Sequence, residues 1–291
     1  MSESAPPQPA AVRRFVDLHM HSTASDGALA PAAVVRAAAA VQLGAIALTD
    51  HDTVAGVPEA RAEGERLGIR VIPGVELSAT ENGQETHLLG LHLSRIDDLE
   101  RHLAGFRDAR RTRAERMVER LNSLGIPITM ASIERQAAGG AIGRPHVARA
   151  LVLGGWVADH RDAFDRYLGA GRPGFVAKPR LEIADAIRLV HDAGGLAVLA
   201  HPGSGCPRDR LTELARAGLD GVEVRHPSHS SEDIARLARE TEALGLVPSG
   251  GSDWHGTPAG PRTIGCMQVS AEWLDRQEAR VEAQRTREPV A

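Results

Sequence analysis

The sequence predicts an α/β protein, a barrel-like domain that is interrupted by a helical insertion. Two observations lead to this prediction. Short apolar runs rich in β-branched residues alternate with helical patterns in the first and last thirds of the chain, which is typical of a mainly parallel sheet wrapped by helices. Between these parts, from about residue 97 to residue 168, helical patterns follow one another without an intervening strand.

The first elements are bounded by proline and glycine. A strand over residues 14–18 ends in His19, and Pro31 then opens an alanine-rich helix, because proline is tolerated in the first turn; Gly44 ends this helix. A strand over 45–49 ends in Asp50, and a helix over 54–67 stops at Gly68. The next strand, 69–77, is expected to break at Pro73 and Gly74.

The strand and helix alternation resumes near residue 181. Helices are expected over 181–193, 208–217 and 232–244, and strands over 196–200, 221–224 and 246–248. The chain is therefore divided into a disordered leader (1–13), a barrel domain (14–96 and 180–271), a helical insertion that caps the substrate (97–179) and a C-terminal tail (272–291), which forms a helix with a frayed end.

Composition excludes several classes of protein. The chain has 291 residues and a net charge of −4, which argues against a general nucleic-acid coat and against duplex DNA as a partner. The most apolar stretch, 32–48, is interrupted by Arg36, Gln42 and Gly44, so no membrane span is expected. Cys206 and Cys266 form no CxxC pair, and the leader lacks a signal-peptide pattern; both features predict a cytoplasmic protein.

The chain is rich in histidine, with 13 His against one Tyr, and many of these residues follow predicted strands. In closed α/β barrels the carboxyl ends of the strands form the active face. A single histidine there is more often structural, but three clusters of histidine and carboxylate at one rim make coincidence improbable. His-x-His and Asp-x-His spacings let two side chains grip one ion, so the sequence predicts a metal site. The residues at this rim are His19, His21, Asp50, His51, Glu76, His201, Asp253 and His255.

Six motifs in order resemble the PHP (polymerase and histidinol phosphatase) family. They are DLHMHS with SDG, LTDHDT, GVELS, HLLG, AHPG and GSDWH. The resemblance is greatest to stand-alone phosphoesterases that act on nucleoside 3',5'-bisphosphates and on the 5' ends of short RNA. It implies a distorted (β/α)7 barrel, similar to a TIM barrel, with up to three divalent ions.

The resemblance also implies the ligands of each ion. One ion would be held by His19, His21, Glu76 and Asp253. Glu76 would bridge to a second ion held by His87 and His201, and the third would be held by Asp26, His51 and His255. Many family members have histidine in place of Asp26. The carboxylate of Asp26 makes the third site of this chain harder and more anionic than a site with histidine.

A cluster of this kind suits phosphate-ester hydrolysis. Two or three divalent ions are expected; mixed imidazole and carboxylate ligation favours manganese, with iron or zinc as alternatives, over magnesium. A hydroxide bound to the metals and held by Glu76, His201 and Asp253 would be the nucleophile. Asp17 and Asp50 precede ligand histidines and either orient their rings or, in the case of Asp50, cap the following turn.

Four further residues are predicted to contact the substrate phosphates: Arg144, His146, His226 and His229. Arg144 presents a guanidinium fork in a proline-stiffened turn, and the two later histidines follow a strand. The basic run 107–120 is interspersed with acidic residues and is interpreted as an exposed helix with i,i+4 ion pairs and not as an RNA track.

The sequence therefore predicts a metal-dependent phosphoric ester hydrolase that removes the 3'-phosphate of a nucleoside 3',5'-bisphosphate. The alternatives are a 5'-3' exonuclease on short 5'-phosphorylated RNA, a phosphatase of the histidinol-phosphate type and, from another class, a non-catalytic module with the same fold. Non-catalytic modules of this kind usually lose metal ligands, whereas each motif here keeps a ligand-type residue. The expected partner is a small nucleotide or a short RNA.

Overall fold

The computed structural model describes residues 15–137, 142–177, 181–257 and 262–286, and the statements below concern these ranges. The predicted leader lies outside them. Eight strands form one sheet in the order β7-β6-β5-β4-β3-β2-β1-β8. The strands are β1 (Phe15–Met20), β2 (Ala45–Leu48), β3 (Arg70–Glu81), β4 (Gln84–Leu91), β5 (Leu196–Leu199), β6 (Gly221–Arg225), β7 (Val247–Gly250) and β8 (Val269–Ser270).

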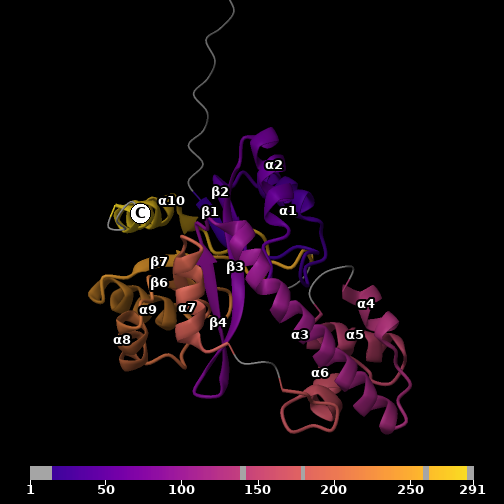
Figure 1. Cartoon of the computed structure of the whole chain (residues 1–291). Coiled ribbons are helices and arrows are strands. Elements are labelled where there is room, and N and C mark those ends of the chain that lie inside the picture. Colours follow the sequence, from indigo (N-terminus) through magenta and orange to yellow (C-terminus); the bar gives the residue numbers. More distant parts are fainter. Residues whose placement is uncertain (1–14, 138–141, 178–180, 258–261, 287–291) are drawn as a thin grey trace, which may run out of the picture.

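The sheet is mixed and not simply parallel. Strands β1, β2 and β3 pair in parallel, as do β5, β6 and β7, but β4 is antiparallel to both β3 and β5. β4 joins β3 in a long hairpin, visible at the lower centre of Figure 1. Neither β4 nor the short β8, which pairs with β1 in antiparallel fashion, was predicted as a strand.

The predicted break in the third strand is wrong. Pro73 is the last residue of β3 that pairs with β2, opposite Leu48, and Gly74 is the first that pairs with β4, opposite Leu91. A proline is tolerated where the pairing with one neighbour ends, since its missing N–H is not needed there. At Gly74 a side chain would meet the Leu48 carbonyl, so glycine permits the close approach.

The sheet nearly closes into a barrel, which confirms the predicted fold class. After β7 the chain runs beside β1: the Asp253 N–H donates to the His19 carbonyl at 2.9 Å, and the His21 N–H donates to the Trp254 carbonyl at 2.9 Å. Gly251 makes this seam possible, because a Cβ there would collide with the backbone of His19. The last ligand motif is thus hydrogen-bonded to the first.

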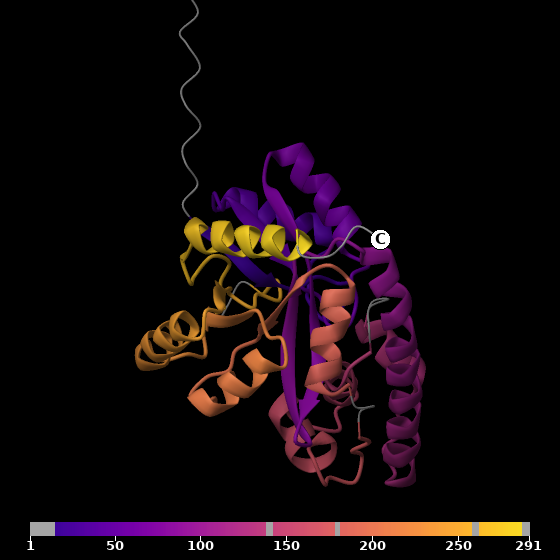
Figure 2. The same ribbon diagram turned by 60° about the vertical axis from the view of Figure 1, so that its left-hand side comes forward.

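Helices cover the outside of the barrel. α1 and α2 pack on the β1 to β3 side, and α7 to α9 pack on the β4 to β7 side (Figure 1). α10 lies across the end opposite the hairpin, as Figure 2 shows, with Leu274 and Val281 in the core. The bounds are α1 (Pro31–Ala40), α2 (Val57–Leu67), α7 (Ile183–Asp192), α8 (Arg208–Arg216), α9 (Ser231–Ala243) and α10 (Ala271–Arg285).

The insertion between β4 and α7 is helical and has its own apolar core. Its long first helix descends beside the hairpin, and the shorter helices pack on the far end of it (Figure 1). The elements are α3 (Ile96–Ser123), α4 (Met130–Ala137), α5 (Arg144–Leu153), α6 (His160–Ala163) and η1 (Phe164–Leu168). Among the described residues, no helix combines the length and apolarity needed to cross a bilayer.

Candidate metal centre

Glu76, buried on β3, lies at the centre of the site. Its Oε1 is 2.8 Å from His87 Nδ1 and 3.0 Å from His201 Nε2. Its Oε2 is 3.2 to 3.3 Å from a ring nitrogen of each of three other histidines. A single carboxylate therefore faces imidazoles from five places in the chain, namely His19, His21, His51, His87 and His201.

The first group of potential ligands consists of His19, His21, Glu76 and Asp253, all buried, with ligand atoms within 4.8 Å of one another. β1 positions both histidines: His19 is in the strand and His21 follows it, so the period of two turns both rings the same way. Asp253 comes from the chain that closes the barrel against β1, and its Oδ1 is 3.0 Å from His21 Nε2.

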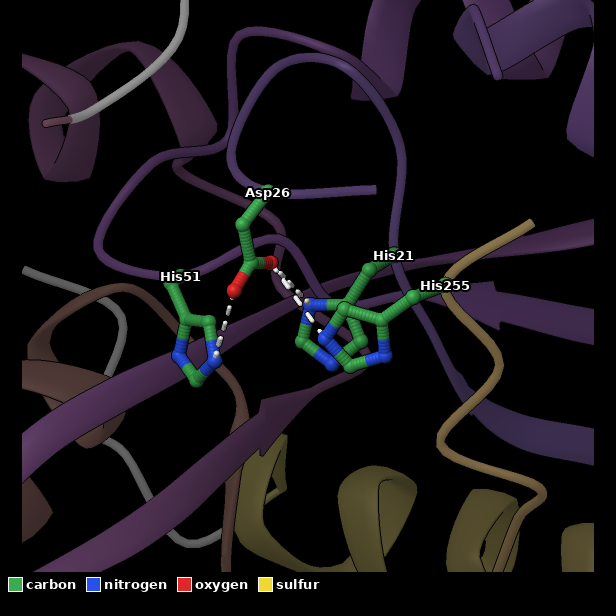
Figure 3. A group of neighbouring side chains, drawn as sticks. All are labelled: His21, Asp26, His51 and His255. Atoms are coloured by element: carbon green, nitrogen blue, oxygen red, sulfur yellow. Dashed lines mark ion pairs between the residues drawn. The ribbon is translucent and has the colours of Figure 1, made fainter. Parts of the chain in front are cut away.

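A second group surrounds Asp26, as Figure 3 shows. Its carboxylate lies between His51 on one side and His21 and His255 on the other (Figure 3), and its Oδ1 is 3.3 Å from His255 Nε2. The distance from Oδ2 to His51 Nε2 is 4.0 Å. These four residues also offer ligand atoms within 4.8 Å of one another.

The third group is His51, Glu76 and His87. His201 reaches the same Glu76 oxygen as His87, so it adjoins this group. The structure thus brings all nine predicted ligands to one end of the barrel, with Glu76, His21 and His51 shared between groups.

Two of these residues have an unfavourable backbone conformation. His201 has φ of 29° and Asp253 has φ of 49°, both in the left-handed region that favours glycine. Each such residue costs on the order of 1–3 kcal/mol and persists only where its surroundings hold it. The strained backbone that directs these two side chains inward therefore lowers the stability of the fold, which is common at functional sites.

Charge pairing governs the electrostatics of the cluster. Burial alone would lower the pKa of His21, but Asp253 and Glu76 outweigh this effect and raise the pKa to about 10. Burial lowers the pKa of His51 to about 3. Despite burial, the surrounding imidazoles hold the pKa of Glu76 and of Asp253 well below the usual range. Carboxylates in this site are therefore ionised and available as ligands at neutral pH.

The donor set fits divalent cations. His21 Nδ1 is buried without a hydrogen-bond partner among the described residues, and His51 Nδ1 lies 3.2 Å from Glu76 Oε2 without forming a hydrogen bond to it. A bond to a metal ion would relieve this costly arrangement. Imidazole nitrogens mixed with carboxylate oxygens suit manganese, iron or zinc.

Comparison with known proteins agrees with this geometry. The model of the PHP domain family matches residues 17–170. A 3',5'-nucleoside bisphosphate phosphatase from Chromobacterium violaceum is 38% identical over 86% of this chain and 90% of its own length. The chain belongs to the PHP family.

Two further matches support the family. The 5'-3' exoribonuclease Rnm of Escherichia coli is 38% identical over 82% of this chain and 84% of its own length. A solved structure from Bifidobacterium adolescentis, described as a metal-dependent phosphoesterase, has a TM-score of 0.82, 32% identity and coverage of 91% of this chain and 96% of that one. The predicted family and the predicted enzyme class, a metal-dependent phosphoric ester hydrolase, are confirmed.

Beside the metal centre, the PHP chain has a cavity of about 170 Å³. The insertion contributes a cationic wall, and the barrel contributes Asp26, His51 and His87 from the centre itself. Arg144 Nη2 is 2.9 Å from Glu85, and its guanidinium lies over Phe164 at 5.6 Å. The lining residues from the insertion include Arg110, Arg113, Arg144, His146 and Phe164.

The interpretation of residues 107–120 as an exposed helix is wrong at Arg110 and Arg113. Arg110 and Arg113 are only 8% and 9% exposed and face the cavity. Arg110 pairs with Asp52 and donates to the Ser78 hydroxyl, whereas Arg113 donates to the Val176 carbonyl. The sequence carried a signal: both arginines share one helix face with Met117 and Leu121, which are buried.

The two histidines after β6 lie outside the lining of this cavity. His226 is buried, with Nε2 3.3 Å from Asp253 and Nδ1 2.7 Å from the Ser228 hydroxyl. His229 donates from Nδ1 to the Val224 carbonyl and accepts at Nε2 from the Gly203 N–H. Both ring nitrogens of His229 are thus engaged, which leaves none for a substrate phosphate.

Asp17 and Asp50 accept hydrogen bonds from the backbone of neighbouring loops. Asp17 accepts from the N–H groups of Ser252 and Gly265, and Asp50 accepts from the N–H and hydroxyl of Ser22. They therefore fix the loops that carry the ligand histidines.

Sequence reasoning missed Glu223 and Arg262. Glu223 on β6 contacts His19, and Arg262 pairs with Asp253. The signal for Glu223 was its position between two valines in the apolar strand GVEVR, where a buried carboxylate needs a reason.

Proposed function

We propose that this PHP protein is a phosphatase of nucleoside 3',5'-bisphosphates, which removes the 3'-phosphate and leaves the 5'-monophosphate. In this proposal two or three divalent ions, with manganese favoured, are held by His19, His21, Asp26, His51, Glu76, His87, His201, Asp253 and His255. The ions would neutralise the phosphate oxygens and lower the pKa of bound water. The proposed location of the protein is the cytoplasm.

The observation that carries the proposal is a pair of buried donors in the cavity beside the centre. His146 is 1% exposed, and its Nδ1 accepts from the Gly143 N–H, so the proton of the neutral ring is on Nε2. Burial lowers the pKa of His146 to about 4, which keeps the ring neutral. Neither His146 Nε2 nor Arg110 Nε has an acceptor among the described residues.

Unsatisfied buried donors cost about 1–3 kcal/mol each, so the cavity favours a ligand with an acceptor, which the described residues do not provide. Arg113 and Arg144 add positive charge to the same wall. A phosphate group has the oxygens and the charge that these four side chains would bind. Because His51 and His87 line both this cavity and the metal centre, one small molecule with two phosphates can reach both places.

The same centre favours a second substrate class. On the other side of His87 and His201, a cavity of about 610 Å³ opens between the β3–β4 hairpin and α8. Arg210, bonded to Glu81 and Thr86, lies in its wall. This space could take the remaining nucleotides of a short 5'-phosphorylated RNA, so exonuclease action on short RNA is the alternative.

The test is phosphate release with added Mn²⁺ from adenosine 3',5'-bisphosphate, 5'-AMP, histidinol phosphate and a short 5'-phosphorylated RNA. We expect the bisphosphate to have the highest kcat/KM. His146→Ala should lower kcat/KM for the bisphosphate by roughly 10-fold or more, while Arg149→Ala, an exposed arginine on the same helix, should change little. Equal kcat/KM for bisphosphate and 5'-AMP would overturn the proposed substrate.

A further inference from the structure

We propose that Glu223 is a positioning residue, which sets the orientation of two metal ligands, His19 and His201. The inference rests on the proposed metal centre. Glu223 is the middle residue of β6 and is 0% exposed. Its strand neighbours Val222 and Val224 belong to the apolar core.

The first contact fixes the ring of His19. Glu223 Oε1 is 3.0 Å from His19 Nδ1, and because a carboxylate can only accept, Nδ1 must donate. In the neutral ring that a metal ion requires, Nε2 then has the free lone pair, and it points to the metal centre, 3.3 Å from Glu76 Oε2 and 3.4 Å from Asp253 Oδ1. A carboxylate behind a ligand histidine in this way selects the tautomer and raises the basicity of the ring.

The second contact fixes the backbone of His201. The N–H of His201 donates to Glu223 Oε2 at 2.7 Å, a charge-assisted bond. His201 has φ of 29°, a conformation that costs energy and needs a partner to hold it. One carboxylate thus ties the ligand after β5 to the ligand on β1.

The cost of burying the Glu223 carboxylate indicates that its two contacts are functional. An ionised carboxylate in a core costs several kcal/mol to desolvate, and an apolar residue of similar size would fill the same space without that cost. A buried carboxylate that touches two metal ligands is instead what the metal centre requires for a defined geometry.

The chain offers a matched control on the same part of the barrel. Asp220, which directly precedes β6, is also buried, and it accepts from His191 Nε2 at 2.8 Å and from the Ala197 N–H at 3.0 Å. Like Glu223, it accepts from a histidine ring and from a backbone amide; it also accepts from Gln284 Nε2 of α10 at 2.6 Å. Its histidine belongs to α7 and to none of the three ligand groups.

The experiment compares Glu223→Gln and Asp220→Asn in the full-length protein, by titration with Mn²⁺ alone and by thermal unfolding of the metal-free protein. The single carbonyl oxygen of glutamine cannot replace both acceptors, so we expect Mn²⁺ affinity to fall by roughly 10–100-fold, with turnover largely recovered at saturating Mn²⁺. Asp220→Asn should lower the melting temperature and leave Mn²⁺ affinity unchanged.

Mn²⁺ binding by Glu223→Gln equal to that of the unsubstituted protein would overturn the inference, as would an equal loss of affinity in Asp220→Asn. If Glu223→Gln does not fold, Glu223→Asp takes its place: it keeps the charge but is too short to span both partners, and normal affinity in that variant would also overturn the inference. The unsubstituted protein in the same titration reports on the metal centre itself, so failure of the centre and failure of the positioning role are distinguishable.

Discussion

Replacing Glu76 by glutamine tests the metal centre at its most connected residue. The substitution keeps the size of the side chain and removes its charge. It also converts one oxygen into an amide that donates, so either His87 and His201 or the other three imidazoles would face a donor. If Glu76 holds two ions, as proposed, an amide in its place should weaken the binding of both.

The magnitude follows from the burial of the partners. Glu76 is 1% exposed, and removing one partner of a buried ion pair costs about 3–5 kcal/mol. At 1.36 kcal/mol per tenfold change, this corresponds to roughly 10²–10⁴ in metal affinity. We therefore expect Glu76→Gln to bind Mn²⁺ at least about 100-fold more weakly and to lose turnover in parallel.

The assay combines isothermal titration with Mn²⁺ and phosphate release at the same Mn²⁺ concentrations. Glu81→Gln is the control, because Glu81 lies on the same strand but pairs with Arg210 at the hairpin end. Near-normal turnover in Glu76→Gln would refute the reasoning, as would lost turnover with unchanged metal affinity.

Three other substitutions test the cavity, the seam of the barrel and the burial of His92. Arg144→Ala should raise KM for the bisphosphate by roughly 10–100-fold with a smaller effect on kcat, measured by steady-state phosphate release; an unchanged KM would contradict the cavity assignment. Gly251→Ala should destabilise the protein by about 1–3 kcal/mol, because its Cβ would meet the His19 backbone; thermal unfolding measures this, and an unchanged melting temperature argues against the tight seam. Burial lowers the pKa of His92 to about 4, so the unfolded chain binds a proton that the native chain does not, and stability falls as the pH drops from about 6.5 to about 4. Denaturant titrations over this range should show that the free energy of unfolding of His92→Gln depends less on pH than that of the unsubstituted protein. The same pH dependence in both proteins would contradict the lowered pKa of His92.

The fold class and the convergence of the ligands were predictable, because both follow from the short apolar strands and from the histidines and carboxylates at their ends. His19, His51 and His201 each come at or just after a short apolar run, and parallel strands bring such ends to one rim. The seam between His19 and Asp253, in contrast, depends on a backbone approach that only the closed barrel reveals.

The hairpin and the cationic wall could not be predicted in the same way. β4 begins with four polar residues, QETH, of which the first two are exposed and the next two half-buried, and it becomes buried only in its second half, so its strand pattern is short. Arg110 and Arg113 resemble solvated surface charges in the sequence, since their burial requires the insertion to fold back over the centre. Long-range packing, which local pattern does not encode, decides both features.

Diffraction from crystals grown with Mn²⁺, recorded with anomalous signal, tests the central claim most directly. We expect anomalous peaks within ligand distance of Glu76, one of them shared with His19, His21 and Asp253 and another near Asp26 and His255. A crystal at saturating Mn²⁺ with no peak among these side chains, or with His19 and Asp253 far apart, would contradict the account.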